Sequence, residues 1–382
     1  MALKYLYVPS GYKAGTAYGV LPNDSSADFD EFARDTIATR INADGLVETM
    51  ATNVPRLDYT DGSCPALLTE PESNNRVKYS EDFGQWLTTV SGTGVAPVIS
   101  TGFSAPDGSS NARKIVFDKG AGSTSSDICF IKDSYPSEVD IFTQTVWMRT
   151  ESGTANVLMD FNSSNNNEVL VTTTWQRMTL TKSSTFTVNK EFRIGLRGGS
   201  STVDSATILV WGAQLERQPY ATSYIRNNGN VGGVTRSADT GVISGDLSSY
   251  INSSEGVLEI KAKALFNGGN DCRISLSDGT SSNRLGLIWG TTTNNVSVIF
   301  QIGATTVTSG SFTHDQTEMA TFKIKWKSGD IQVKLNGTVV FTSTNSFSGF
   351  FIDQIRLDKG TAQHFFQGNI QYIKVYDSVD DF

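Results

Sequence analysis

The sequence predicts an all-β protein made of two antiparallel β-sandwiches that follow a proline-rich leader. Short apolar segments alternate with polar ones, turn residues separate them, and no helical periodicity lies between them. The composition agrees, because only 18% of the 382 residues are charged, 38% are hydrophobic and 35 are glycine. We therefore expect facing sheets that close two cores, rather than a disordered chain.

Residues 1–75 are expected to form an irregular leader, because proline disfavours central strands. Five of the nine prolines fall in this stretch: Pro9, Pro22, Pro55, Pro65 and Pro71. Between Ala38 and Met50, the pair Asp44-Gly45 predicts a hairpin turn. The irregular leader is a candidate for docking on a partner protein.

Residues 76–230 are predicted to form the first antiparallel sandwich. The segment Ile141–Arg149 alternates, with Val146 and Met148 on the expected core face and Trp147 and Arg149 on the other. Residues 231–246 are expected to be a linker. Residues 247–382 are predicted to form the second sandwich, in which Asn336-Gly337 marks a type I′ hairpin turn.

Charge and composition exclude several functional classes. The chain has 31 basic and 39 acidic residues and a net charge of −8, which disfavours nucleic-acid binding. No apolar run is long enough for membrane insertion, and the N-terminus lacks a secretory signal pattern. Three cysteines and two histidines offer no disulfide framework and no histidine-rich zinc site.

Three stretches resemble a module of bacteriophage tail and fibre proteins that is similar to jelly-roll carbohydrate-binding domains. They are VKYSEDFGQW at Val77–Trp86, WGAQLERQPYATSYI at Trp211–Ile225 and TRSAD at Thr235–Asp239. The upstream segment Ala38–Glu72, with PRLDY and LLTEPE, resembles the leader that often precedes this module.

The C-terminal block resembles laminin-G and concanavalin-A-like sandwiches at Phe322–Trp326, at the Leu335–Gly337 turn and at Phe366–Tyr376. Hydrolytic relatives of that sandwich carry three alternating carboxylates on one strand, whereas here Glu255 and Glu259 have no acid between them. We therefore expect a protein that is not an enzyme and has no catalytic residues.

The resemblance implies a structural virion protein on the surface of a phage tail or capsid, of the tail-fibre or head-fibre type. Such a protein would adhere non-catalytically to host-surface glycans as a homo-oligomer, with a trimer expected, since multivalency strengthens weak sites. Its leader would contact other virion proteins. The alternatives are a capsid-decoration or tail protein without a ligand, a polysaccharide-degrading enzyme, and a secreted bacterial lectin.

Four residues form the sequence-based hypothesis for glycan binding: Trp147, Arg149, Arg193 and Arg197. If their strands share one sheet, they present an aromatic ring and three guanidinium groups on its outer face, and sugars bind such groups by stacking and hydrogen bonding. The competing interpretation is a solvated face or a face packed on a neighbouring subunit.

No cofactor is expected apart from a structural Ca²⁺, for which Asp271, Asp278 and Asn283 could supply oxygen ligands. The competing interpretation is that these side chains cap turns.

Overall fold

The computed structural model describes residues 2–29, 32–135, 138–161, 167–184, 190–241, 243–269, 271–380 and 382. Strands dominate these residues and pair in antiparallel sheets, which confirms the all-β fold. The helical segments found there, η1 (Ser25–Ala27) and η2 (Phe83–Gln85), are three residues long. In the part of the chain that is described, no helix has the length and apolarity that crossing a bilayer requires.

The chain divides into two compact units. Unit 1 comprises Met1–Gly45, Thr49–Glu72 and Ser237–Phe382, and unit 2 comprises Leu46–Glu48 and Ser73–Arg236. This division differs from the expected order of leader, sandwich, linker and sandwich, because most of the first 72 residues group with the C-terminal sandwich.

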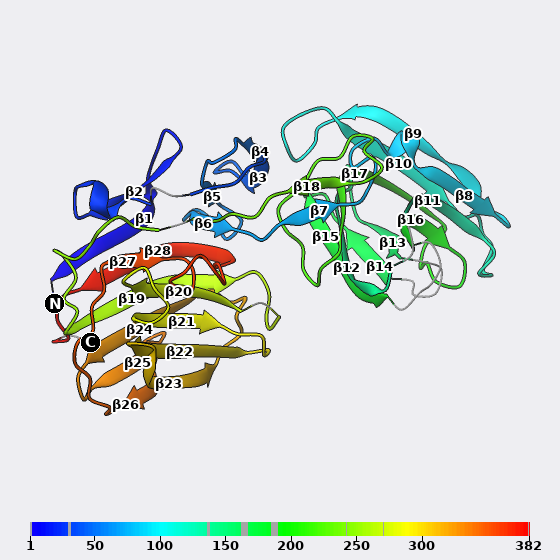
Figure 1. Ribbon diagram of the computed structural model, residues 1–382. Coiled ribbons are helices and arrows are strands. Elements are labelled where there is room, and N and C mark those ends of the chain that lie inside the picture. Colours follow the sequence, from blue (N-terminus) through cyan, green and yellow to red (C-terminus); the bar gives the residue numbers. More distant parts are fainter. Residues whose placement is uncertain are drawn as a thin grey trace. The chain divides into compact units, whose positions relative to one another are not determined.

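Unit 2 is a sandwich of two five-stranded sheets (Figure 1). The first sheet, in spatial order, consists of β15 (Gln176–Ser184), β12 (Asp140–Arg149), β17 (Ser205–Glu216), β10 (Ala112–Asp118) and β9 (Val95–Phe103). The second consists of β14 (Asn167–Val171), β13 (Ala155–Asp160), β16 (Lys190–Arg197), β11 (Ile128–Tyr135) and β8 (Leu87–Ser91). A short ribbon pairs β7 (Ser73–Asn75) with β18 (Val234–Arg236).

Alternation along the strands builds the core of unit 2. Val146 and Met148 of β12 are buried together with Ile194 of β16, as the sequence pattern predicts. The register shifts near Gly212 in β17, where the backbone has a φ of 66°. This bulge at a glycine keeps Val210 and Ala213, three residues apart, in the same core.

Unit 1 is also built from two sheets. The larger one has the order β2 (Thr16–Leu21), β1 (Leu3–Lys13), β28 (Gly368–Tyr376), β19 (Glu255–Ala264), β24 (Ala320–Lys327), β25 (Ile331–Leu335) and β26 (Thr338–Ser343), and also includes β5 (Arg56–Asp58) and β6 (Ala66–Thr69). The smaller one has the order β23 (Thr305–Thr313), β22 (Asn295–Ile302), β21 (Arg284–Trp289), β20 (Cys272–Ser277) and β27 (Gln354–Arg356).

Two hairpin turns that the sequence predicts are confirmed. β3 (Ala38–Ile41) and β4 (Val47–Met50) pair around Asp44-Gly45, where Gly45 has a φ of 77°. At the second turn, Asn336 and Gly337 both have positive φ, 49° and 87°, and they join β25 to β26. Positive φ at both central positions is the requirement of a type I′ turn.

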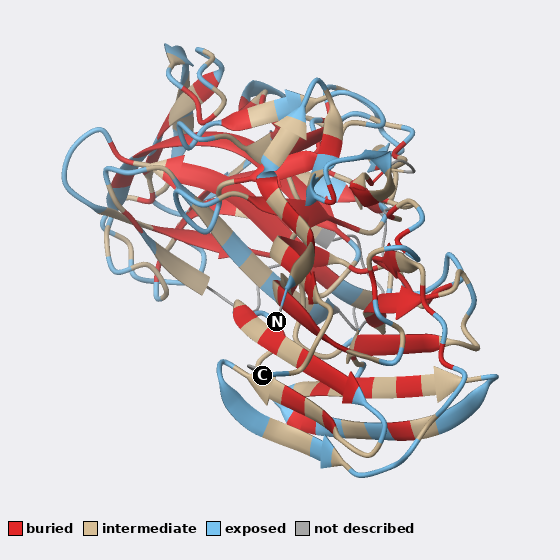
Figure 2. Ribbon diagram, turned by 90° about the vertical axis from the view of Figure 1, so that its left-hand side faces the viewer, coloured by how far each residue is buried: buried red, intermediate tan, exposed pale blue. Residues whose placement is uncertain are grey.

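The first 75 residues differ from the irregular leader that the prolines indicated. β1 and β6 both pair with β28, through Tyr7↔Ile373 and Leu67↔Ile370, and β1 lies along β28 in Figure 1. Tyr5 of β1 is buried in the core of the C-terminal sandwich. Buried residues are coloured red in Figure 2.

Four of the five prolines flank these strands, and the fifth lies at an irregularity inside one. Pro22 follows β2, Pro55 precedes β5, and Pro65 and Pro71 flank β6. Pro9 lies in the part of β1 where the register shifts between Tyr7 and Tyr12. Proline is tolerated at strand ends and irregularities, because no ladder hydrogen bond from its nitrogen is required there.

A buried ion cluster joins distant parts of unit 1. Arg34 and Arg56 each contact the Asp239 carboxylate with their guanidinium group, and Nη1 of Arg34 lies 3.0 Å from Oδ1 of Asp239. Arg56 also contacts Glu70 at 2.6 Å, and the Glu70 amide donates to Asp239 at 2.8 Å. Their side chains are at most 2% exposed.

Backbone carbonyl groups complete the cluster. Arg34 donates to the carbonyl oxygens of Thr36 and Val54, and Arg56 donates to that of Thr39. Buried charges are tolerated when each has such a set of partners. The cluster unites the PRLDY, LLTEPE and TRSAD stretches, so these sequence features hold unit 1 together.

We expect Arg56→Met to lower the free energy of unfolding of unit 1 by about 3–5 kcal/mol, because it leaves the buried Glu70 and Asp239 carboxylates under-compensated. Lys263→Met, which removes the partly exposed Lys263–Asp61 pair, should cost at most ~1 kcal/mol. Urea unfolding of both variants measures the difference. Equal, small losses would contradict a structural role for the cluster.

Candidate functional site

The four residues of the glycan-binding hypothesis do not share one face. Trp147 and Arg149 belong to β12 in the first sheet of unit 2, whereas Arg193 and Arg197 belong to β16 in the second sheet. Because both pairs occupy the non-core positions of their strands, they lie on opposite outer faces of the sandwich. The shared face that the hypothesis required is therefore absent.

Trp147 is packed inside an aromatic cluster and only 7% exposed. Its ring lies 5.3 Å from that of Trp211 and 5.6 Å from that of Tyr224, centroid to centroid. The Arg177 guanidinium lies 4.5 Å from the Trp147 ring and donates to the Thr222 carbonyl at 2.7 Å. Through these contacts the segment that follows β17 and carries Tyr224 packs against the outer face of the first sheet.

The same segment is locked to the Val77–Trp86 stretch by hydrogen bonds. Tyr224 shares a 2.8 Å hydroxyl contact with Ser80 and donates to Glu81 at 3.0 Å. Burial first and the Glu81 charge second raise the pKa of Tyr224, so the phenol stays a donor. The stretches VKYSEDFGQW and WGAQLERQPYATSYI thus contact each other and stabilise unit 2.

Arg193 and Arg197 are engaged within the protein. Arg193 forms an ion pair with Glu191, which also contacts Lys132 at 2.7 Å. Burial would raise the pKa of the Glu191 carboxyl, but the hydrogen bond from Lys132 and the Arg193 charge lower it overall. Arg197 donates to the carbonyl oxygen of Ser125 at 3.0 Å.

The residues of the calcium hypothesis do not form one site. Asp271 pairs with Arg273, whose Nε lies 2.7 Å from the carboxylate. Burial would raise the pKa of Asp271, but the hydrogen bond and the charge of Arg273 lower it overall. Asp278 accepts hydrogen bonds from Thr280 and from the Asn283 side chain, at 2.6 and 2.7 Å. Asp271 and Asp278 flank opposite ends of β20, so Asp271 lies apart from the other two, and the contacts of Asp278 with Thr280 and Asn283 are those of a capped turn.

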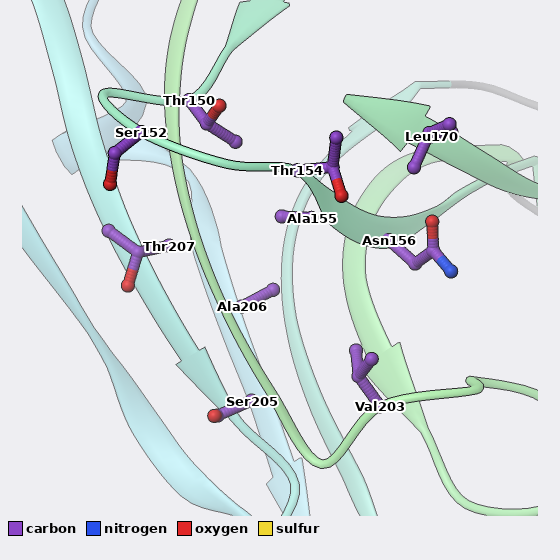
Figure 3. Close-up of a pocket in the computed structure, with 10 residues that line it drawn as sticks. All are labelled: Thr150, Ser152, Thr154, Ala155, Asn156, Leu170, Val203, Ser205, Ala206 and Thr207. Atoms are coloured by element: carbon purple, nitrogen blue, oxygen red, sulfur yellow. The ribbon is translucent and has the colours of Figure 1, made fainter. Parts of the chain in front are cut away.

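A pocket of about 320 Å³ opens at one end of the unit 2 sandwich. Its lining residues are Thr150, Ser152, Thr154, Ala155, Asn156, Leu170, Val203, Ser205, Ala206 and Thr207. In the view of Figure 3, Ser152, Ser205 and Thr207 lie on one side and Asn156, Leu170 and Val203 on the other. The lining thus combines hydroxyl groups and one amide with small apolar surfaces.

Arg149 and Trp175 lie next to this lining. Arg149 precedes Thr150, and the Thr150 amide donates to the Thr172 carbonyl at 2.7 Å in the turn that carries Trp175. The Arg149 guanidinium lies 5.3 Å from the centre of the Trp175 ring. Trp175 is half-buried, so part of its ring remains accessible at this end of the sandwich.

Arg149 is apparent as a candidate in the sequence, but the pocket is not. Its lining residues are mostly serine, threonine and alanine, which carry no distinctive sequence signal, and they come from segments up to 57 residues apart (Thr150 to Thr207). Trp175 begins an apolar segment in the sequence, and only the fold places it in a turn outside the core.

We expect Trp147→Ala to lower the free energy of unfolding of unit 2 by about 3–5 kcal/mol, since it opens a cavity in a buried aromatic cluster. Trp175→Ala should cost roughly 1 kcal/mol or less, because Trp175 lies outside that cluster. Chemical denaturation of the two variants compares these losses. A larger loss for Trp175→Ala would mean that it is the structural tryptophan.

Comparisons with known proteins do not identify a family. No family model and no curated protein matches this chain. It is similar to the carbohydrate-binding module CBM40 of the Ruminococcus gnavus IT-sialidase, solved with α2,3-sialyllactose, at 17% identity over 36% of this chain and 86% of that chain, with a TM-score of 0.30. It is also similar to the laminarinase catalytic domain of Thermotoga maritima (12% identity, 39% and 72% covered, TM-score 0.28) and to CBM66 from Bacillus subtilis (12%, 33% and 73%, 0.22).

Proposed function

We propose that this protein is a non-catalytic glycan-binding protein, and that unit 2 contacts the glycan at the pocket beside Arg149 and Trp175. The observation that carries the proposal is the accessible Trp175 ring, held by Arg149 next to a pocket lined with hydroxyl groups. An aromatic ring stacks on the apolar face of a sugar, and fixed polar groups bind its hydroxyl groups.

We propose binding rather than cleavage because the lining of this pocket contains no carboxylate. Glycoside hydrolysis ordinarily requires two acidic side chains across the bond that is cleaved. Glu151 lies between the lining residues Thr150 and Ser152, but its carboxylate forms an ion pair with Lys114 at 2.7 Å. Incubation with polysaccharides tests this choice, since a fall in product size would reveal an enzyme.

We further propose that the protein lies on the surface of a bacteriophage tail or capsid. There it would form a homotrimer, in which three weak glycan sites act together and bind more strongly than one. This location is proposed because the Val77–Trp86 and Trp211–Ile225 stretches resemble a module of bacteriophage tail and fibre proteins. We also propose that the N-terminal residues dock on other virion proteins, as the same resemblance implies. A ligand-free decoration protein is the alternative, favoured if the intact chain binds no glycan.

We expect Trp175→Ala and Arg149→Ala each to weaken glycan binding at least about tenfold, the effect of losing roughly 1.4 kcal/mol. Glycan arrays with the full chain select the ligand, and titration calorimetry measures the affinity. Arg193→Ala is the matched control, since it removes a guanidinium from the opposite face and should leave binding unchanged. Unchanged binding by Trp175→Ala would exclude this site.

A further inference from the structure

One outer face of unit 1 carries a dense set of lysines. Seven of them occupy the non-core positions of adjacent strands in the larger sheet: Lys261 and Lys263 on β19, Lys323, Lys325 and Lys327 on β24, Lys334 on β25 and Lys374 on β28. The intervening residues, such as Ile260, Ile324 and Ile373, are buried in the core. We call these seven residues the lysine face.

Carboxylates are interleaved with the lysine face but do not balance it. Glu259 at its centre contacts Lys323 at 3.2 Å and Lys374 at 3.6 Å. Three further pairs are Lys263–Asp61, Lys325–Asp330 and Lys327–Glu255, at 2.6 to 2.8 Å. The Asp380 charge also acts on Lys327, so within the described residues seven lysines meet five carboxylates, an excess of two positive charges in a chain whose net charge is −8.

Hydroxyl and amide groups lie among these charges. Tyr372 donates to Glu259 at 2.9 Å, and Tyr376 donates to the same carboxylate at 3.3 Å. Gln332 on β25 donates to Asp330 at 2.8 Å. Lys261 is half-buried and makes no ion pair within the described residues, so its ammonium group can pair with a ligand anion. The Lys334 ammonium group lies 4.4 Å from the centre of the Phe382 ring and forms no ion pair within the same residues.

We propose that the lysine face binds an acidic polysaccharide, one whose sugars carry carboxylate or sulfate groups. Lysines two residues apart on a strand are roughly 7 Å apart, and neighbouring strands lie about 4.8 Å apart, so the cations form a flat grid along which an extended anionic chain can run. The excess positive charge attracts the acidic groups of such a chain.

The interleaved carboxylates distinguish a polysaccharide from a nucleic acid. A sugar hydroxyl group can donate a hydrogen bond to Glu255 or Asp330, whereas the backbone of duplex DNA presents only acceptors, which these carboxylates repel. The face therefore complements a ligand that carries both anions and donors. This site lies in unit 1 and does not depend on the pocket proposed for unit 2.

The test uses the full chain with polygalacturonate and heparin as probes, and with neutral dextran and duplex DNA as comparisons. Binding to both acidic polysaccharides, weakened by added salt and absent for dextran, is expected. The triple variant Lys261→Gln, Lys327→Gln, Lys334→Gln should bind at least tenfold more weakly. Lys13→Gln, Lys78→Gln, Lys359→Gln removes the same charge elsewhere and should bind normally, as should Trp175→Ala.

Several results would overturn the proposal. They are absence of binding to both acidic polysaccharides, equal binding to duplex DNA, and equal loss in the two triple variants. If the first triple variant unfolds, Lys261→Gln alone repeats the measurement without removing an ion pair, and unchanged affinity for polygalacturonate would then contradict the site. Failure of glycan binding at the unit 2 pocket leaves these outcomes unaffected.

Discussion

The buried cluster of Arg34, Arg56, Glu70 and Asp239 is the interaction on which unit 1 depends. Arg34 and Asp239 are 205 positions apart, yet their side chains meet in the interior. Each buried charge there requires the others, because an unpaired ion in that environment costs several kcal/mol. The cluster holds Glu70, which directly follows β6, beside Asp239, and β6 lies against β28.

This arrangement changes what the recognisable sequence stretches mean. PRLDY, LLTEPE and TRSAD supply the ion cluster of unit 1, and the stretches around Ser80 and Tyr224 lock unit 2. These contacts are architectural, so the glycan-binding sites have to be argued from other surfaces. The pocket beside Trp175 and the lysine face both lie outside these stretches.

Local patterns in the sequence predicted local structure well. Alternation around Val146 and Met148 identified a strand and its core face, and Asn336-Gly337 identified a turn, because both depend on neighbouring residues only. Sheet membership depends on pairing between distant segments, which alternation does not encode. For this reason the sequence could place Arg149 and Arg193 on one face only if their strands shared a sheet, and the fold puts those strands in different sheets.

The candidate sites likewise depend partly on local sequence patterns and partly on the pairing of distant strands. The alternation of Lys323, Lys325 and Lys327 is visible in the sequence, but the neighbouring strand that carries Lys261 lies about 60 positions away, so the face emerges only with the sheet order. The prolines misled for a related reason: their positions at strand ends become apparent only when the strands are known.

Hydrogen exchange of the full chain tests the central claim, that the N-terminal segment is part of the C-terminal sandwich. Amide protons of β1 between Leu3 and Tyr7 should be protected to a degree similar to those of β28, because the two strands share one sheet and one core. Rapid exchange throughout β1, with β28 still protected, would contradict the account and restore a separate leader.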